Sequence, residues 1–275
     1  MEHFKHIIIT RFNLSERWKV DKSKNLVLDD EWLNDRYKLF VDFCFPSIKN
    51  QTCQNFEWWV YFDIKLGKKH KAINEKWNKE YPNFIPKYEN SYNDFEANMP
   101  KDIHQMIIAK NIRWVITTRL DNDDVFANDS IEKIQKIENF QEMSLLEFPL
   151  GYTLNLGDKS ILRKKTEYLN PFISLVEKVY PDALIKSVYF NQHNKWEEVE
   201  KKVISDIPQW IQIIHDKNIS NQSNGLEVNP YDLQSRFKFN DTGINFKSRF
   251  YYLYRDTKMY LFKIKKRFKL FFFIK

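Results

Sequence analysis

Three carboxylates follow an apolar segment near the middle of the sequence. Asp121, Asp123 and Asp124 come directly after residues 114–120, with only Asn122 between the first two. Asp121 and Asp123 stand two residues apart across a tight turn and can approach one hard cation. Mg²⁺ or Mn²⁺ commonly joins one or two carboxylates to substrate phosphates, and Asp124 adds a third oxygen donor. The same residue types also form Asx turns and helix caps, so a purely structural role stays open.

Polar side chains end two other apolar runs. Thr10 and Arg11 follow the aliphatic residues 7–9, and Asp63 ends the aromatic run that starts at residue 57. Ligands bind outside the carboxyl ends of strands in open α/β sheets, so these side chains are expected at one edge with the acidic cluster. A carboxylate suits a base N–H, arginine suits phosphate, and a cation suits a pyrophosphate. The predicted residues for a nucleotide-sugar donor are Thr10, Arg11, Asp63, Arg119 and Asp121.

The composition excludes several other kinds of site. The chain has 275 residues and an apolar fraction of 43%, which suits a folded chain with a sizeable core. Its five glycines leave no room for a Walker loop or a G-x-G-x-x-G turn. An EF-hand fails because Phe126 stands where that loop needs glycine. Two cysteines are too few for a disulfide framework and are expected to be reduced.

Strands and helices that alternate along the chain must position the polar residues. Pro46 is expected to end or kink the first helix, and residues 82–98 are expected to form a loop. The alternation predicts an α/β fold with a largely parallel sheet. The predicted strands are 6–10, 57–63, 113–120, 143–148, 160–162, 187–190 and 210–214, and the predicted helices are 31–49, 67–80, 102–110, 128–139 and 195–203.

At this point the sequence resembles a known family, the "putative rhamnosyltransferase" family, over roughly residues 4 to 225. The most specific match is Thr117-Thr118-Arg119-Leu120-Asp121-Asn122-Asp123-Asp124. Supporting matches are residues 9–13, 36–47, 62–63, 170–175 and 208–218. The resemblance implies a GT-A-like fold, that is, a Rossmann-like mixed, mostly parallel sheet flanked by helices. It also implies a glycosyltransferase with a D-x-D metal motif, which falls here on Asp121 and Asp123. Mn²⁺ or Mg²⁺, a nucleotide-sugar donor, rhamnose as the sugar, and a glycan or lipid-linked acceptor complete the expectation.

Histidine and carboxylate candidates complete the predicted site. Many GT-A enzymes add a C-terminal histidine to the metal site. His215, which ends the apolar run 210–214, is the expected third ligand, with a capping or core histidine as the rival interpretation. His193 is the second histidine candidate. An inverting transfer needs a carboxylate base. The catalytic candidates are Glu177 and Asp124, with Asp158 and Asp206 as further possible bases among which the sequence does not choose.

The positive charge of the chain is concentrated at its end. The formal net charge is +7, yet residues 247–275 contain ten of the 44 lysines and arginines and one acid. Aromatic and aliphatic residues recur there at helical spacing, which predicts a basic amphipathic helix in the interface of an anionic membrane. A helix packed on the body is the main alternative. Stacking on nucleic acid is disfavoured because no recognition fold accompanies the tail. The predicted domains are 1–246 and 247–275.

The terminal segments favour a cytoplasmic location, at the inner face of the membrane. The three-residue aliphatic run near the N-terminus is shorter than a signal peptide needs, and the longest apolar run in the tail has five residues. Two other functions remain open. The same acids could serve a metal-dependent nuclease or phosphohydrolase, or the protein could be a non-catalytic membrane or nucleic-acid adaptor.

Overall fold

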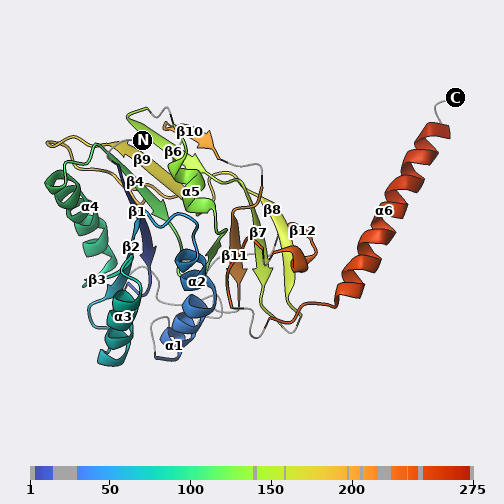
Figure 1. The fold of residues 1–275 in the computed structure, drawn as a ribbon, viewed down its shortest axis with the longest axis horizontal. Helices are drawn as coiled ribbons and strands as arrows, with labels where there is room; N and C mark the ends of the chain where they lie inside the picture. Colours follow the sequence, from blue (N-terminus) through green and yellow to red (C-terminus); the bar gives the residue numbers. More distant parts are fainter. Residues whose placement is uncertain are drawn as a thin grey trace.

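A seven-stranded sheet forms the centre of the protein (Figure 1). Its order is β10-β6-β9-β4-β1-β2-β3, and only β9 runs against its neighbours. The computed structural model describes residues 4–14, 30–138, 141–157, 159–196, 198–204, 207–215, 224–233, 235–240 and 244–272. The strands are β1 (Phe4–Arg11), β2 (Glu57–Asp63), β3 (Phe84–Glu89), β4 (Trp114–Arg119), β6 (Met143–Glu147), β9 (Ile173–Lys178) and β10 (Glu200–Val203).

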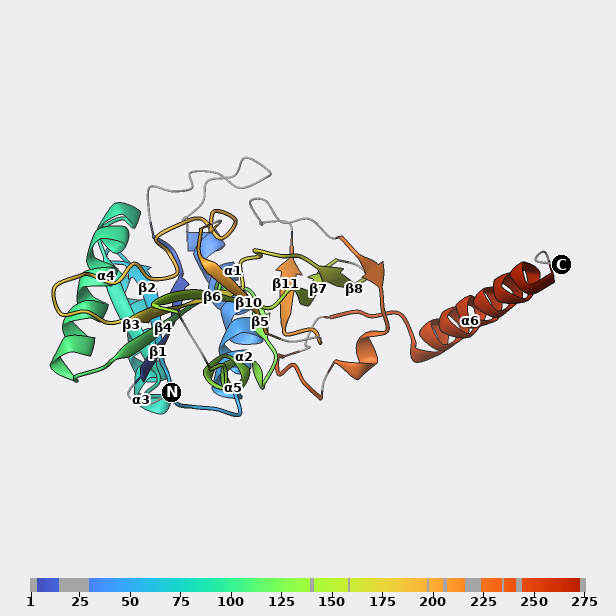
Figure 2. The same ribbon diagram turned by 90° about the horizontal axis from the view of Figure 1, so that it is seen from above.

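Helices cover both faces of this sheet because successive apolar side chains of a strand point to opposite faces. Ile8 of β1 packs with the helices α1, α2, α3 and α5, whereas Ile7 and Ile9 pack with α4. Figure 2 shows α4 on the opposite side of the sheet from α1 and α2. The helices are α1 (Asp30–Leu39), α2 (Phe45–Lys49), α3 (Lys68–Glu80), α4 (Tyr92–Ala109), α5 (Ser130–Gln135) and α6 (Arg249–Phe272).

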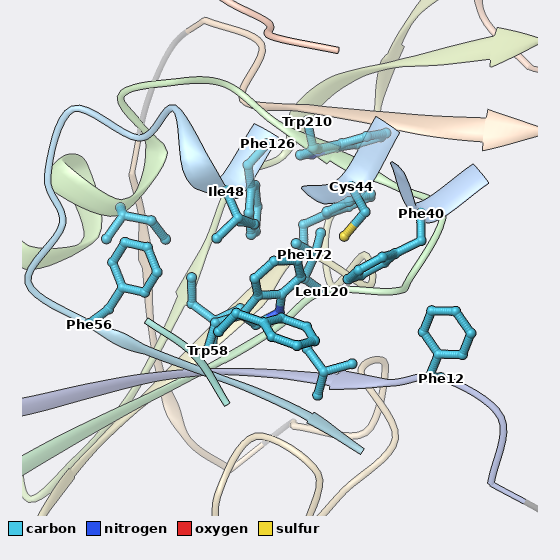
Figure 3. Close-up of a cluster of buried hydrophobic side chains, with 14 of the residues drawn as sticks. Phe12, Phe40, Cys44, Ile48, Phe56, Trp58, Leu120, Phe126, Phe172 and Trp210 are labelled. Carbon is cyan, nitrogen blue, oxygen red and sulfur yellow. The ribbon is translucent and has the colours of Figure 1, made fainter. Parts of the chain in front are cut away.

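The larger core cluster lies between the sheet and the α1–α2 segment (Figure 3). Phe40, Cys44 and Ile48 come from that segment, and the Phe40 ring centroid lies 5.2 Å from that of Trp58 on β2. All four side chains are fully buried. The hydrophobic contact they make fixes the helical segment over the sheet.

The helix predicted over 31–49 is interrupted by a π-helical turn, Phe40–Cys44, between α1 and α2. Pro46 has no N–H and cannot donate to the carbonyl four residues earlier. That carbonyl, of Asp42, instead accepts a hydrogen bond from the Asn240 N–H at 2.6 Å. The interruption expected at Pro46 is thus a π-helical turn just before it. The hydrogen bond from Asn240 to the Asp42 carbonyl connects this turn to a segment far away in the sequence.

A second, five-stranded sheet of order β12-β8-β7-β11-β5 lies beside the first. Trp210 of β11 stacks on Phe172 with ring centroids 4.6 Å apart, and it packs against Gly151 of β7. A Cβ atom on Gly151 would lie 2.0 Å from the indole ring, so only glycine fits there. The strands are β5 (Val125–Phe126), β7 (Leu150–Asn155), β8 (Ile161–Thr166), β11 (Trp210–Ile214) and β12 (Leu226–Glu227).

The α/β class with a mostly parallel, helix-flanked sheet and a C-terminal helix is confirmed, but several predicted elements are wrong. Residues 82–98 hold β3 and the start of α4 instead of a loop. Pro86 is tolerated because β3 is an edge strand. Residues 195–203, predicted as a helix, contain strand β10, and residues 187–190 form a turn instead of a strand. Among the described helices, none combines the length and hydrophobicity that a bilayer-spanning segment requires.

Candidate functional site

Three parallel strands of the large sheet end at one edge with polar residues. β1 pairs in parallel with both β2 and β4, and Ile9 lies opposite Arg119. Arg11, at the end of β1, and the segment 121–124, just after β4, therefore share the carboxyl edge with Asp63 at the end of β2. This is the edge at which open α/β sheets bind ligands.

Asp121 lies at the more exposed side of this cluster, between two guanidinium groups. Its Oδ2 is 2.9 Å from Arg119 Nη2, and its Oδ1 is 3.8 Å from Arg11 Nη2. The Asp121 side chain is 32% exposed, against 7% for Asp123. Burial by itself would raise the pKa of Asp121, but Arg119 and Arg11 hold it below its ordinary value. The carboxylate is therefore charged at neutral pH and can be reached by a ligand.

Asp123 lies deeper and joins helix α1 to the end of β11. Arg36 Nη1 donates to Asp123 Oδ2 at 2.6 Å, and His215 Nε2 lies 3.0 Å from the same oxygen. Burial would raise the pKa of Asp123, but Arg36 and His215 hold it well below its ordinary value. The structure thus brings together Asp123 and His215, as predicted, and adds Arg36, for which the sequence suggested no role.

The two remaining residues of the acidic segment hold the site to the fold. Asn122 Nδ2 donates to the Phe12 carbonyl at 2.9 Å, and Asp124 Oδ1 accepts from the Ile213 N–H at 2.9 Å. Burial raises the pKa of Asp124 well above its usual range, and the neighbouring carboxylates raise it further. Because Ile213 lies two residues before His215, Asp124 positions the strand that supplies this histidine. The structure thus places the predicted catalytic candidate Asp124 inside the protein.

Two tyrosines cover the arginines of this edge. The Tyr189 ring centroid lies 4.8 Å from Arg11 Cζ and 5.7 Å from Arg119 Cζ. Tyr92 accepts a hydrogen bond from Arg11 Nη1 at 3.3 Å. Neither tyrosine is among the predicted site residues, because each reaches the edge only through the fold. The rings hold both guanidinium groups beside Asp121.

Two residues predicted to bind the donor, Thr10 and Asp63, make hydrogen bonds within the protein itself. The Thr10 hydroxyl is fully buried and accepts from the Trp58 indole N–H at 2.9 Å, so it faces the core. The prediction that Thr10 binds the donor is therefore wrong. Asp63 lies at the edge as expected, where its Oδ1 accepts from the Lys65 N–H at 2.7 Å and its own N–H donates to Asn13 at 3.1 Å. These bonds fix the turn that follows β2.

Glu177 lies at the opposite end of the sheet. On β9 it stands opposite Val115, near the start of β4, whereas the acidic cluster follows the end of β4. Its carboxylate accepts from the Lys186 and Ser187 N–H groups at 2.7 and 2.8 Å. Burial raises the pKa of Glu177 above its ordinary value. The structure corrects the prediction of Glu177 as the catalytic base, because this side chain closes a turn far from the cluster.

The other candidates have different positions. His193 lies near enough to Arg119 and Asp121 for their charges to act on its pKa, which burial lowers. Its Nδ1 is 2.6 Å from the Leu169 carbonyl oxygen. Asp158 and Asp206 lie outside the described residues.

The side chains of Asp121, Asp123 and His215 have the donor chemistry of a divalent-cation site. Two carboxylates and an imidazole nitrogen are ligands that Mn²⁺ accepts, and carboxylates suit Mg²⁺. Within the described part of the chain, no three His, Cys, Asp or Glu side chains are grouped as metal ligands. Guanidinium groups instead pair with both carboxylates. The donor atoms thus suit a cation in chemistry, but in this structure arginine supplies the positive charge beside both carboxylates.

Comparison with known proteins finds one family. The family model described as "Putative rhamnosyl transferase" matches residues 4–227. No curated protein matches the sequence. Among solved structures, the chain is similar to S. aureus TarS 1–349 in complex with UDP, with 11% identity and a TM-score of 0.39. It is also similar to a second structure of S. aureus TarS 1–349, with 12% identity and a TM-score of 0.37. Each alignment covers 76% of this chain and 60% of that chain, which is less than two thirds of the TarS chain.

Proposed function

The chain belongs to the "Putative rhamnosyl transferase" family, which places it among the glycosyltransferases, and we propose that it moves rhamnose from a nucleotide-sugar donor to a glycan or lipid-linked acceptor. The observation that supports this most directly is a group of polar and charged side chains gathered at the carboxyl edge of the large sheet. The group consists of Arg11, Arg119, Asp121, Asp123 and His215.

The donor's diphosphate would meet the two arginines of the edge. Arg11 and Arg119 are held beside Asp121 by Tyr189, so their positive charge is positioned before a ligand arrives. Guanidinium groups bind phosphate oxygens with two parallel hydrogen bonds. Asp63, at the same edge, is the proposed partner of a nucleobase N–H.

Asp121, Asp123 and His215 are the proposed ligands of Mn²⁺ or Mg²⁺. When bound, such a cation supplies charge that stabilises a leaving nucleoside diphosphate. In the proposed transfer, the acceptor hydroxyl oxygen forms a bond to the anomeric carbon while the bond from that carbon to the diphosphate breaks. The diphosphate keeps the electron pair, and the hydroxyl proton passes to a carboxylate base. Asp158 and Asp206 are the remaining proposed bases.

We also propose that residues 247–275 bind an anionic membrane, at its cytoplasmic face. This tail contains ten basic residues and one acidic residue. Each basic residue near such a surface contributes about 1 kcal/mol. A lipid-linked acceptor would be concentrated at the same surface.

A thermal-shift screen of UDP-, dTDP- and GDP-rhamnose, with and without Mn²⁺, tests the proposed donor and metal. We expect one donor to stabilise the protein in a Mn²⁺-dependent way, and Asp121→Asn and Asp123→Asn to abolish that effect. Glu177→Gln is the matched control, because it changes a buried carboxylate at the other end of the sheet and should keep the response. A Mn²⁺-dependent response that survives in both aspartate variants would contradict the metal assignment. Cleavage of an oligonucleotide without any donor response would favour the nuclease alternative.

A further inference from the structure

Residues 247–255, which we call the root of α6, are fixed to the second sheet. Tyr252 is fully buried, with its ring centroid 6.2 Å from that of Tyr231 and 4.9 Å from Arg255 Cζ. Arg255 Nη1 and Lys247 Nζ each lie 3.3 Å from Glu227 Oε1 at the end of β12. Buried aromatic packing and a shared ion pair thus set the direction in which the helix leaves the body.

The apolar face of α6 points away from that root. Its side chains recur at helical spacing, lie between about a quarter turn and half a turn around the helix from Tyr252, and are between 54% and 82% exposed. Figure 1 shows the helix extending away from the sheets. The body therefore does not cover this face within the described residues, which disfavours the alternative of a helix packed on the body. The exposed residues of this face are Phe250, Leu253, Tyr254, Tyr260 and Leu261.

The root also lies on the same edge as the candidate site. Ile214, just before His215, pairs with Asn155 on β7, and Asn155 pairs with Ile161 on β8. Ser160, just before Ile161, forms a bridge with Phe246. These three lateral steps of about 4.8 Å each place Phe246 about 15 Å from the end of β11. Since α6 begins three residues later, its first turn lies within about 25 Å of His215.

We propose that α6 lies in the surface of an anionic membrane and holds the second sheet (Figure 1), with the acidic cluster beside it, close to the bilayer. Charge complementarity favours this occupant over a second copy of the chain, because two copies would bring their basic residues together. The acceptor is then a short, lipid-anchored carbohydrate whose reacting hydroxyl lies near the membrane surface. This acceptor class rests on the proposed function, whereas the orientation rests only on α6 and its root.

Energy transfer from the full-length protein to labelled vesicles tests the orientation. A fluorophore is attached at Gly157→Cys, on the site edge, or at Lys110→Cys, just before the opposite end of β4. Both variants use a Cys53→Ser background, in which Cys44 is buried. A Cβ at Gly157 meets nothing within 4 Å, so this substitution fits. The vesicles contain phosphatidylcholine, about one-third phosphatidylglycerol, and an acceptor dye on a lipid head group.

We expect roughly twofold or more efficient transfer from position 157 than from position 110, because position 157 follows β7 in the second sheet near the start of α6, whereas position 110 follows α4 on the large sheet (Figure 1). Equal transfer, or stronger transfer from position 110, would overturn the orientation. The measurement involves no sugar nucleotide, so its failure is distinguishable from a failure of the proposed transferase activity.

Substitutions on α6 test the membrane as the occupant. Tyr260→Ser with Leu261→Ser should weaken co-sedimentation with the same vesicles roughly tenfold or more, because two large apolar side chains are lost from the inserted face. Met259→Ser is the matched control on the other side of the helix and should change binding by less than about twofold. Unchanged binding in the double variant would refute the proposal. So would self-association of the wild-type protein without vesicles that the double variant abolishes.

Discussion

The buried His6 should make the stability of this fold depend on pH. Its Nε2 lies 2.7 Å from Thr118 Oγ1, and its Nδ1 lies 3.0 Å from the Gln135 amide nitrogen. An amide nitrogen can only donate, so Nδ1 is the acceptor and the neutral ring carries its proton on Nε2. Burial, with a smaller effect of Lys5, lowers the pKa of His6 from 6.5 to about 3.

The size of the effect follows from the two pKa values of His6. The unfolded chain binds a proton near pH 6.5, but the folded chain does so only near pH 3. The contribution of neutral His6 to stability is therefore fully present above the unfolded pKa and is lost as pH falls toward the folded pKa. Between pH 7 and 5 this linkage lowers the free energy of unfolding by about 2 kcal/mol.

Urea unfolding of the wild type and of His6→Gln at pH 7 and pH 5 measures this effect. Glutamine retains hydrogen-bonding groups and does not titrate, so the loss of stability between the two pH values should be about 2 kcal/mol smaller in the variant. Comparing the pH-dependent losses removes the constant cost of the substitution. Equal losses in the two proteins would refute the neutral, buried histidine.

Two further predictions concern packing and a buried ion pair. Gly151→Ala should lower the free energy of unfolding by about 1–3 kcal/mol because the new methyl group meets an indole ring. Gly157→Ala, with open space around it, should change it by less than about 1 kcal/mol, and equal effects in urea unfolding would contradict this packing. Arg36→Met should cost about 3–5 kcal/mol because Asp123 loses its closest cation. Arg36→Met with Asp123→Leu should recover most of this loss, and no recovery would refute the argument.

Part of the site follows from local sequence because strand ends in an α/β sheet meet at a common edge. The run before Asp121, and the apolar run before His215, are long enough to identify as strands. Arg36 also carried an unused signal. It lies four residues after Trp32 and beside Tyr37 on the buried face of α1, where an arginine requires an acidic partner. Its partner, Asp123, is 87 residues away in the sequence, so only the fold could identify it.

The misassigned residues show where local reasoning fails. Glu177 belongs to the one strand that runs against its neighbours in the large sheet, so its position in the sequence did not reveal which edge it occupies. Thr10 precedes a site residue, but alternate side chains of a strand point to opposite faces, and its hydroxyl meets Trp58 in the core. Strands such as β10 are short and polar, and their pairing partners define them more than their own residues do.

The sequence by itself determined the acidic cluster, the α/β class, the family resemblance and the basic, amphipathic character of the last helix. Those properties depend on residue types at short spacing, which a chain displays before it folds. Tertiary structure alone decided which arginine pairs with which carboxylate, which residues face the site, and that the apolar face of α6 points away from the body. Those outcomes depend on side chains that are distant in sequence, and burial makes their charges act on one another strongly.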